Sequence, residues 1–130
     1  MLLDFQINMI VKDSDVEPCV SFYKGLGFEE RYRTPGDGPA EHVEVRAVGL
    51  TLGISSLSAA RDFHGLDVRT SGNAVQVCLW CEDIDAEFER MLGAGARVAR
   101  KPADFQNGHL RNAWVLDPGD NMLQLVQQRS

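Results

Sequence analysis

Hydrophobic and polar residues follow the same order twice along the chain: a strand pattern, a helix pattern and then further strand patterns. Apolar residues three and four positions apart predict helices at Val16–Lys24 and Asp83–Gly93, and a pair of glycines ends each of them. Between the strands we expect loops at 34–39 and 102–108, and a short helix or irregular linker at 57–66. Alternating residues predict eight strands: Phe5–Lys12, Phe28–Arg33, His42–Ala47, Leu50–Ser55, Val75–Cys81, Arg97–Lys101, Ala113–Leu116 and Met122–Val126.

The two halves match each other in local detail as well as in order. Gln6 stands seven residues before Asp13, and Gln76 stands seven residues before Asp83. Acidic residues near the start of each helix suit its positive end, and Asp13–Asp15 is expected to supply an N-cap to the first. This repetition predicts one α+β domain of two βαβββ modules, residues 4–56 and 73–128, joined by a linker at 57–72.

The strongest local signal is the turn sequence Asp117-Pro118-Gly119-Asp120-Asn121. Proline presets the backbone angle that a turn needs, and Gly, Asp and Asn tolerate the left-handed region that closes it. The strand patterns on either side predict a β-hairpin near the C-terminus. In its second strand Gln124 shares a face with Met122 and Val126, which favours a lined concavity over a fully wet face.

Alternation along the strands also predicts which side chains share the sheet face that lies away from the helix. The residues expected on that face in the first module are Gln6, Asn8, Ile10, His42, Glu44, Arg46, Thr51, Gly53 and Ser55. Those expected in the second module are Gln76, Cys78, Trp80, Asn112, Trp114, Leu116, Met122, Gln124 and Val126. Both tryptophans are therefore predicted to lie on the same face of one sheet.

Five short motifs, in order along nearly the whole chain, resemble the vicinal oxygen chelate superfamily. This superfamily includes glyoxalase I, bleomycin-resistance proteins and extradiol dioxygenases. The motifs are Val11-Lys12-Asp13, Ser21-Phe22-Tyr23 with Leu26-Gly27-Phe28, Glu82-Asp83-Ile84-Asp85, Gly93-Ala94-Gly95-Ala96 and Asp117-Pro118-Gly119-Asp120-Asn121. The last of them transposes the Gly and Asp of the usual Asp-Pro-Asp-Gly-Asn. The resemblance implies that the sheets of the two modules curl into a cup, with the helices outside and a ligand or metal inside.

The resemblance also implies where a metal would bind. Members of the family use a His or Gln in the first strand of each module and a Glu in the last strand. The matching positions here are Gln6, Gly53, Gln76 and Gln124. None of them carries a negative charge or an imidazole, and divalent ions in such sites need both. We therefore expect no metal and no cofactor, and expect the glutamines to line a polar pocket.

Net charge and cysteine content limit the classes of partner and the cellular compartment that we expect. A net charge of −6 disfavours nucleic acid, because binding to phosphates needs a basic face. No apolar run is long enough to span a bilayer, the N-terminus lacks the pattern of an export signal, and membrane partners are not expected. Three cysteines, an odd number, favour reduced thiols and a cytoplasmic protein. Because an open sheet edge needs cover and family members commonly dimerise, we expect a homodimer.

Several candidate residues allow two interpretations. Trp80 and Trp114 are suited to stack against planar or cationic ligands, but large aromatic residues also fill space or support a dimer interface. His42 and Glu44 could form an acid/base pair or an off-pattern metal site, whereas the more common outcome is an ion pair with Arg46. His64 and His109 show no informative spacing. Cys78 and Cys81 have CxxC spacing, but residues three apart on a strand point to opposite faces and should not meet.

These observations predict a small-molecule binding protein of the bleomycin-resistance type. Its ligand is expected to be a planar or aromatic organic molecule, held without a metal and without catalytic residues. The predicted ligand-binding residues are Gln6, His42, Glu44, Gln76, Trp80, Asn112, Trp114 and Gln124. The alternative is a divalent-metal-dependent lyase, isomerase or dioxygenase of the same superfamily, which only the fold and the His42/Glu44 pair favour.

Overall fold

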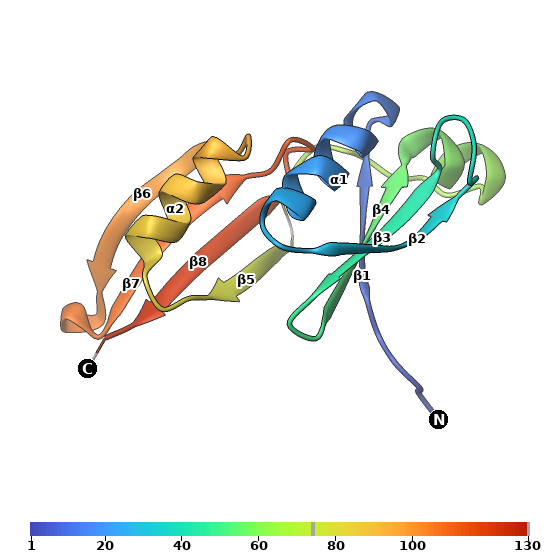
Figure 1. Ribbon diagram of the computed structural model, residues 1–130. Coiled ribbons are helices and arrows are strands. Elements are labelled where there is room, and N and C mark those ends of the chain that lie inside the picture. The colour runs from blue at the N-terminus through green and yellow to red at the C-terminus, as the bar shows by residue number, and fades with distance from the viewer. Residues whose placement is uncertain (74, 130) are drawn as a thin grey trace. The chain divides into compact units, whose positions relative to one another are not determined.

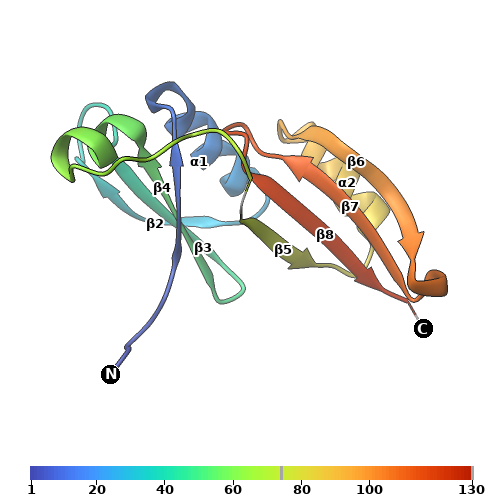
Figure 2. The same cartoon turned by 180° about the vertical axis from the view of Figure 1, so that it is seen from behind.

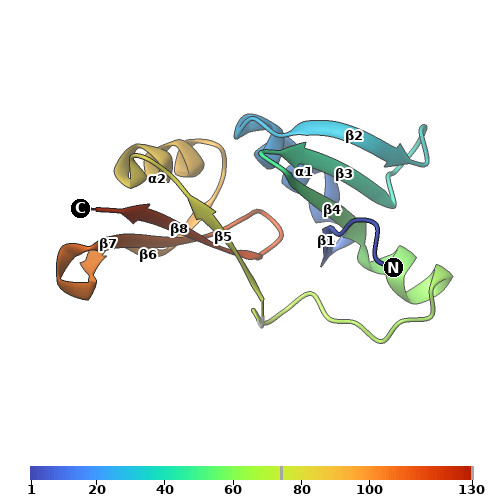
Figure 3. The same ribbon diagram turned by 90° about the horizontal axis from the view of Figure 1, so that it is seen from below.

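The chain consists of two compact units, Met1–Gly72 and Asn73–Ser130. The computed structural model describes residues 1–73 and 75–129, the side chain of Gln106 excepted. Ala74, which the predicted second module includes, and Ser130 lie outside the described residues. No helix or strand occurs in residues 65–73, which lead from the first unit toward the second (Figure 3). Within the described part of the chain, no helix has the length and hydropathy needed to cross a membrane.

The first unit is a four-stranded mixed sheet with one helix packed on it (Figure 1). The strand order is β1-β4-β3-β2, in which β1 runs parallel to β4 and the other neighbours are antiparallel. A 3-10 turn precedes the helix, and a short π-helix follows the last strand. In chain order the elements are β1 (Ile7–Val11), η1 (Asp13–Asp15), α1 (Val16–Gly25), β2 (Glu29–Thr34), β3 (His42–Ala47), β4 (Leu50–Ser56) and η2 (Ala59–Phe63).

The second unit repeats this arrangement. Its strand order is β5-β8-β7-β6, with β5 parallel to β8 and the other pairs antiparallel. Figure 2 shows the face of this sheet that lies away from α2. The elements are β5 (Gln76–Trp80), α2 (Ile84–Gly93), β6 (Arg97–Phe105), the 3-10 turn η3 (Gln106–Gly108), β7 (Leu110–Leu116) and β8 (Met122–Gln128).

The core of each unit lies between its helix and the helix-side face of its sheet. In the first unit Val43, Val45, Leu52 and Ile54 are fully buried against α1, where the ring of Tyr23 packs edge-on against those of Phe22 and Phe28. The buried core residues of the second unit are Ile84, Phe88, Met91, Ala113, Val115, Leu123 and Leu125. Alternation of buried and accessible positions on the central strands follows directly from the period of two along a strand.

The α+β fold of two βαβββ modules is confirmed, whereas several element boundaries are corrected. Gln6 precedes β1 rather than lying within it, and Asp15 makes no side-chain capping bond at the start of α1. The loop predicted at 102–108 is wrong for its first half, because β6 continues to Phe105. Two irregularities in the β6–β7 register break the alternation, and Pro102 is tolerated because β6 is an edge strand. The cup concerns both modules together and stays a prediction.

The turn between β7 and β8 is organised around the buried carboxylate of Asp117. Its Oδ1 accepts hydrogen bonds from the backbone N–H groups of Gly119 and Asn121, at 2.8 and 2.9 Å. The side-chain amide of Asn121 donates to both carboxylate oxygens, and the backbone N–H of Asp117 donates to the carbonyl of Asn121 at 2.9 Å. The turn is thus closed by a carboxylate that belongs to the turn itself. The predicted hairpin is confirmed.

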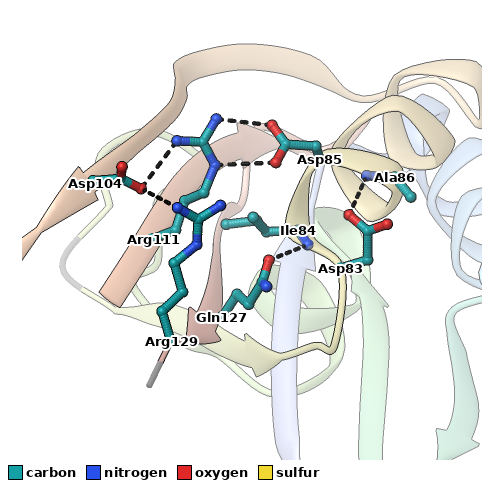
Figure 4. A network of polar contacts seen from close by, with 8 residues as sticks. All are labelled: Asp83, Ile84, Asp85, Ala86, Asp104, Arg111, Gln127 and Arg129. Carbon is teal, nitrogen blue, oxygen red and sulfur yellow. Dashed lines mark hydrogen bonds and ion pairs between the residues drawn. The ribbon is translucent and has the colours of Figure 1, made fainter. Parts of the chain in front are cut away.

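A second polar network ties α2 to the sheet of the second unit (Figure 4). The Arg111 guanidinium donates to the Asp85 carboxylate through Nε and Nη2, at 3.0 and 2.9 Å. Its third nitrogen, Nη1, donates to Asp104 at 3.1 Å. Arg129 also donates to Asp104, so two cations share that carboxylate. Hydrogen bonding to Arg111 lowers the pKa of Asp85. At the start of the helix the Asp83 carboxylate accepts from the Ala86 N–H, as an N-cap does.

Candidate functional site

The face of the first sheet that lies away from α1 carries two rows of polar residues. Cross-strand pairing aligns Thr34, His42, Ser55 and Ile10 in one row. The neighbouring row holds Tyr32, Glu44, Gly53 and Asn8. Residues paired across neighbouring strands point to the same side of a sheet, so these side chains meet on one face. The predicted placement of His42, Glu44, Gly53 and Ser55 on a common face agrees with this register.

A chain of hydrogen bonds runs along this face. Ser55 Oγ lies 2.8 Å from His42 Nδ1, and His42 Nε2 lies 2.9 Å from Glu44 Oε2. The amide of Gln6 donates to the same Glu44 oxygen at 3.1 Å and to Asn8 Oδ1 at 2.9 Å. Hydrogen bonds from His42 and Gln6 lower the pKa of Glu44, so the carboxylate is anionic at neutral pH. The structure therefore brings Gln6, His42 and Glu44 together.

Glu44 does not form the ion pair that was expected with Arg46. The Arg46 guanidinium donates instead to Thr51 Oγ1 at 2.6 Å, because Thr51 is its direct cross-strand neighbour. The Glu44 carboxylate is hydrogen-bonded to His42 instead. Both side chains are partly buried, with exposures of 22% for His42 and 26% for Glu44. The hydrogen bond between them is therefore less exposed to competition from water than one between fully exposed groups.

A pocket of about 360 Å³ lies beside this hydrogen-bond chain, entirely within the first unit. Its volume falls at the lower end of the range for small-molecule sites. Polar side chains from β1–β4, from the loop before β3 and from the segment after η2 line one part of it: Asn8, Thr34, Glu41, His42, Ser55 and His64. The apolar part is lined by Ile10, Ala59, Ala60 and Leu66.

His64 belongs to this pocket although its spacing in the sequence gave no signal. It directly follows η2, a π-helix that contacts β4. Asn8, Ser55 and Thr34 are further pocket residues that were not among the predicted binding residues. Alternation did place Asn8 and Ser55 on the correct face, and that signal could have identified them. His109, the other histidine without a spacing signal, lies in the second unit and does not line this pocket.

Gly53 is required by the close approach of two side chains. A Cβ atom at this position would lie 2.1 Å from Asn8 Oδ1 and 2.7 Å from His42 Cε1. Both distances are far below van der Waals contact, so a larger residue would displace the imidazole or the amide. The imidazole therefore occupies the space that a side chain from position 53 would need.

On the second sheet an indole and two amides form a corresponding chain. Trp114 Nε1 donates to Gln76 Oε1 at 3.1 Å, and Gln76 Nε2 donates to Gln124 Oε1 at 2.9 Å. Pairing of β5, β8 and β7 aligns Cys78, Gln124 and Trp114 in one row, and Trp80, Val126 and Asn112 in the next. The five residues predicted in this module thus share one face, three of them in direct contact.

The two tryptophans are not neighbours on that face. Strand β8 separates them, and they stand in different rows. The ring of Trp114 packs edge-on against Phe105, with centroids 6.2 Å apart, and Arg100 lies over the Phe105 ring. Trp80 is 65% exposed, a large accessible area for an indole. Each ring therefore offers its own contact surface, rather than the two sides of a single slot.

Asn112 is almost entirely buried beside Val126, at 8% exposure. Its Oδ1 atom makes no hydrogen bond within the described part of the chain. The CxxC cysteines behave as strand geometry requires: Cys78 is exposed on the face away from α2, whereas the Cys81 thiol donates to the Val126 carbonyl at 3.6 Å. Burial raises the pKa of both thiols, which makes neither a ready nucleophile.

Comparison with known proteins agrees with this architecture. The model of the Glyoxalase/Bleomycin resistance protein/Dioxygenase superfamily matches residues 6–125, and the chain belongs to this superfamily. No curated protein matches the chain.

Solved structures share the fold at low sequence identity. Hypothetical protein SA1046 from S. aureus is 19% identical, with 98% of this chain and 94% of that chain covered and a TM-score of 0.79. A glyoxalase/bleomycin resistance protein/dioxygenase family enzyme from Burkholderia phytofirmans PsJN is 18% identical, with coverage of 95% and 97% and a TM-score of 0.78. TioX from Micromonospora sp. ML1 is 19% identical, with coverage of 98% and 100% and a TM-score of 0.71.

The residues at the family's metal-binding positions do not fit a divalent ion. Gln76 and Gln124 are hydrogen-bonded to each other, Gln6 is hydrogen-bonded to Glu44, and Gly53 has no room for a side chain. None of the four contributes charge. The described residues also contain no group of three or more His, Cys, Asp or Glu side chains placed to hold a metal. His42 and Glu44 are thus a hydrogen-bonded pair without the further ligands that a metal site needs.

Proposed function

We propose that this protein binds a small planar or aromatic organic molecule without a divalent metal. The observation that carries the proposal is the hydrogen-bond chain Trp114–Gln76–Gln124. Gln76 and Gln124 stand at two positions that the resemblance assigned to metal ligands, but here they are hydrogen-bonded to each other, and Gln76 also accepts from the Trp114 indole. The amides still have free hydrogen-bonding capacity toward a ligand, since each offers two donors and one acceptor oxygen with two lone pairs. We expect this binding to occur in the cytoplasm, where cysteine thiols stay reduced.

The tryptophans support an aromatic ligand. Gln76 and Phe105 hold the Trp114 ring in one orientation, so little conformational freedom is lost when a ligand stacks on it. Trp80 offers a largely exposed ring on the same sheet face. Indole rings attract planar and cationic groups through dispersion and through the negative face of the π-system. A metal-dependent lyase, isomerase or dioxygenase is the less supported function, because the donor set lacks charge.

Binding should weaken at least about tenfold in Trp80→Ala and in Trp114→Ala, because each change removes about 1 kcal/mol of stacking together with the area that the ring buries, and about 1.4 kcal/mol in all is a factor of ten. A panel of planar heteroaromatic compounds is first screened by quenching of tryptophan fluorescence, and affinities are then measured by calorimetry. Trp114→Phe keeps a ring but removes the N–H donated to Gln76, which separates stacking from hydrogen bonding. Phe63→Ala removes another exposed aromatic ring, in the first unit, and is the matched control.

Metal analysis of the purified protein completes this test. Less than a tenth of an equivalent of divalent metal per chain is expected after purification without chelator. A stoichiometric metal would overturn the proposal, as would a ligand that binds both tryptophan variants as tightly as it binds the parent.

We further infer that the protein is a homodimer. Each sheet has open edge strands, and the N-terminal segment 1–6 before β1 carries the exposed apolar residues Met1, Leu2, Leu3 and Phe5. Such edges and apolar segments are usually covered by a partner. Light scattering at micromolar concentration should give twice the chain mass of 14.4 kDa. A single-chain mass would contradict this, and removal of residues 1–5 tests whether the N-terminal segment contributes.

A further inference from the structure

The hydrogen-bond chain of the first unit has the connectivity of a catalytic relay. Ser55 Oγ, the His42 imidazole and the Glu44 carboxylate follow one another at 2.8 and 2.9 Å. The anionic carboxylate accepts only, so His42 Nε2 carries the proton that it donates to Glu44. In the neutral imidazole Nδ1 is then the acceptor, and the hydroxyl of Ser55 donates to it. This is the order hydroxyl, base and orienting carboxylate that activates a serine.

The three groups are held by neighbouring strands rather than by loops. His42 and Ser55 are direct cross-strand partners on β3 and β4, and Glu44 stands two residues from His42 on the same face. Gln6 provides a second hydrogen bond to the same Glu44 oxygen, which restricts the rotation of the carboxylate. Groups placed on strands keep their geometry better than groups placed on loops.

The second unit provides an internal comparison. The row that aligns Ile10, Ser55 and His42 in the first unit aligns Trp80, Val126 and Asn112 in the second. Glu44 likewise corresponds to Trp114, opposite Gln124. The same backbone arrangement therefore does not produce a relay by itself; the relay depends on three residues particular to the first unit.

Both the hydroxyl and the base are accessible to a ligand. Ser55 and His42 line the 360 Å³ pocket of the first unit. Its apolar part, with Ala59 and Ala60, suits a short acyl group, whereas the Glu41 carboxylate disfavours an anionic substrate. Asn8 and His64 also line this pocket and carry N–H groups, the kind of donor that stabilises a developing oxyanion.

We propose that Ser55 is a nucleophile activated by His42, in a site that transfers the acyl group of a small neutral ester to water. Ser55 Oγ bonds to the carbonyl carbon while its proton passes to His42 Nδ1. The tetrahedral adduct then breaks its bond to the alkoxy oxygen, which takes that proton and leaves as the alcohol. Water attacks the acyl-serine, gives a proton to His42, and the carboxylic acid departs as Ser55 regains its proton. Glu44 acts as a positioning residue for the imidazole throughout.

Two probes test this on the intact purified chain. A fluorophosphonate should add once per chain, with the adduct mapped to Ser55 by peptide mass spectrometry. p-Nitrophenyl acetate should be hydrolysed, and Ser55→Ala should lower the rate at least a hundredfold and abolish labelling. The surface variant Ser71→Ala is the matched control and should behave like the parent. Hydrolysis that persists in Ser55→Ala, or an adduct on any residue other than Ser55, would overturn the proposal, as would failure of the parent to react with both probes.

The positioning role of Glu44 has a readout that a structural role would not change. In Glu44→Gln the amide can donate to His42 Nε2, which shifts the ring proton to Nδ1 and removes the acceptor for Ser55. We expect kcat to fall at least tenfold with KM and the melting temperature unchanged, and a rise in KM alone would contradict the role. Ser55→Ala should leave the binding of planar ligands intact, so this proposal and the binding proposal can fail separately.

Discussion

Replacement of Asp117 by alanine should lower the free energy of unfolding by about 3 kcal/mol, because buried donors that lose their acceptor cost about 1–3 kcal/mol each. The carboxylate is fully buried and accepts two backbone N–H groups and the Asn121 amide. All three donors would lose this acceptor in Asp117→Ala. Urea unfolding followed by circular dichroism measures the change.

Two further variants distinguish the contribution of the Asp117 carboxylate to stability from that of the negative charge of the turn as a whole. Asp117→Asn keeps one acceptor oxygen and should recover part of the loss. Asp120 lies in the same turn but is largely exposed and pairs with Arg97 at the surface, so Asp120→Asn should cost less than about 1 kcal/mol. Equal losses in Asp117→Ala and Asp120→Asn would show that the buried acceptor is not the important feature.

The second large effect is expected at Gly53. Gly53→Ala should destabilise the protein by about 1–3 kcal/mol, as overpacking does, because the new Cβ meets His42 Cε1 at 2.7 Å. Asn8 is exposed and can turn aside, but His42 cannot move without loss of its hydrogen bonds to Ser55 and Glu44. Chemical denaturation gives the magnitude.

A double-mutant cycle shows whether the imidazole is the cause. The clash with the ring is absent in the His42→Ala background, so Gly53→Ala should cost less there than in the parent. The difference between the two costs is the coupling between positions 42 and 53. Additive costs would mean that Gly53 is needed for its backbone rather than for the space that it leaves to His42.

Sequence reasoning succeeded where strands alternate without interruption. The bounds of His42–Ala47 were predicted to the residue, and the side chains of β4, β5, β7 and β8 were assigned to the correct faces. It failed at β6, because register irregularities around Arg100 let the strand continue through Pro102. Alternation was the main signal used to recognise the strands, and a bulge removes it.

The polar contacts were harder to predict than the faces. Proximity along β3 favoured a pair between Glu44 and Arg46, but Arg46 has Thr51 across the strand and Glu44 has His42. His64 reaches the pocket through the π-helix η2, an element with no reliable sequence pattern. Spacing along the sequence does not show which of several neighbouring groups a side chain will contact. It also does not predict a contact that depends on a rare backbone conformation.

The space shared by Gly53 and His42 has a consequence for how such chains diverge. Any side chain at position 53 would compete with the imidazole for the same space, so a related chain that replaces this glycine would need a smaller residue at position 42 or an imidazole turned away from Ser55 and Glu44. We therefore expect positions 42 and 53 to change together among related chains.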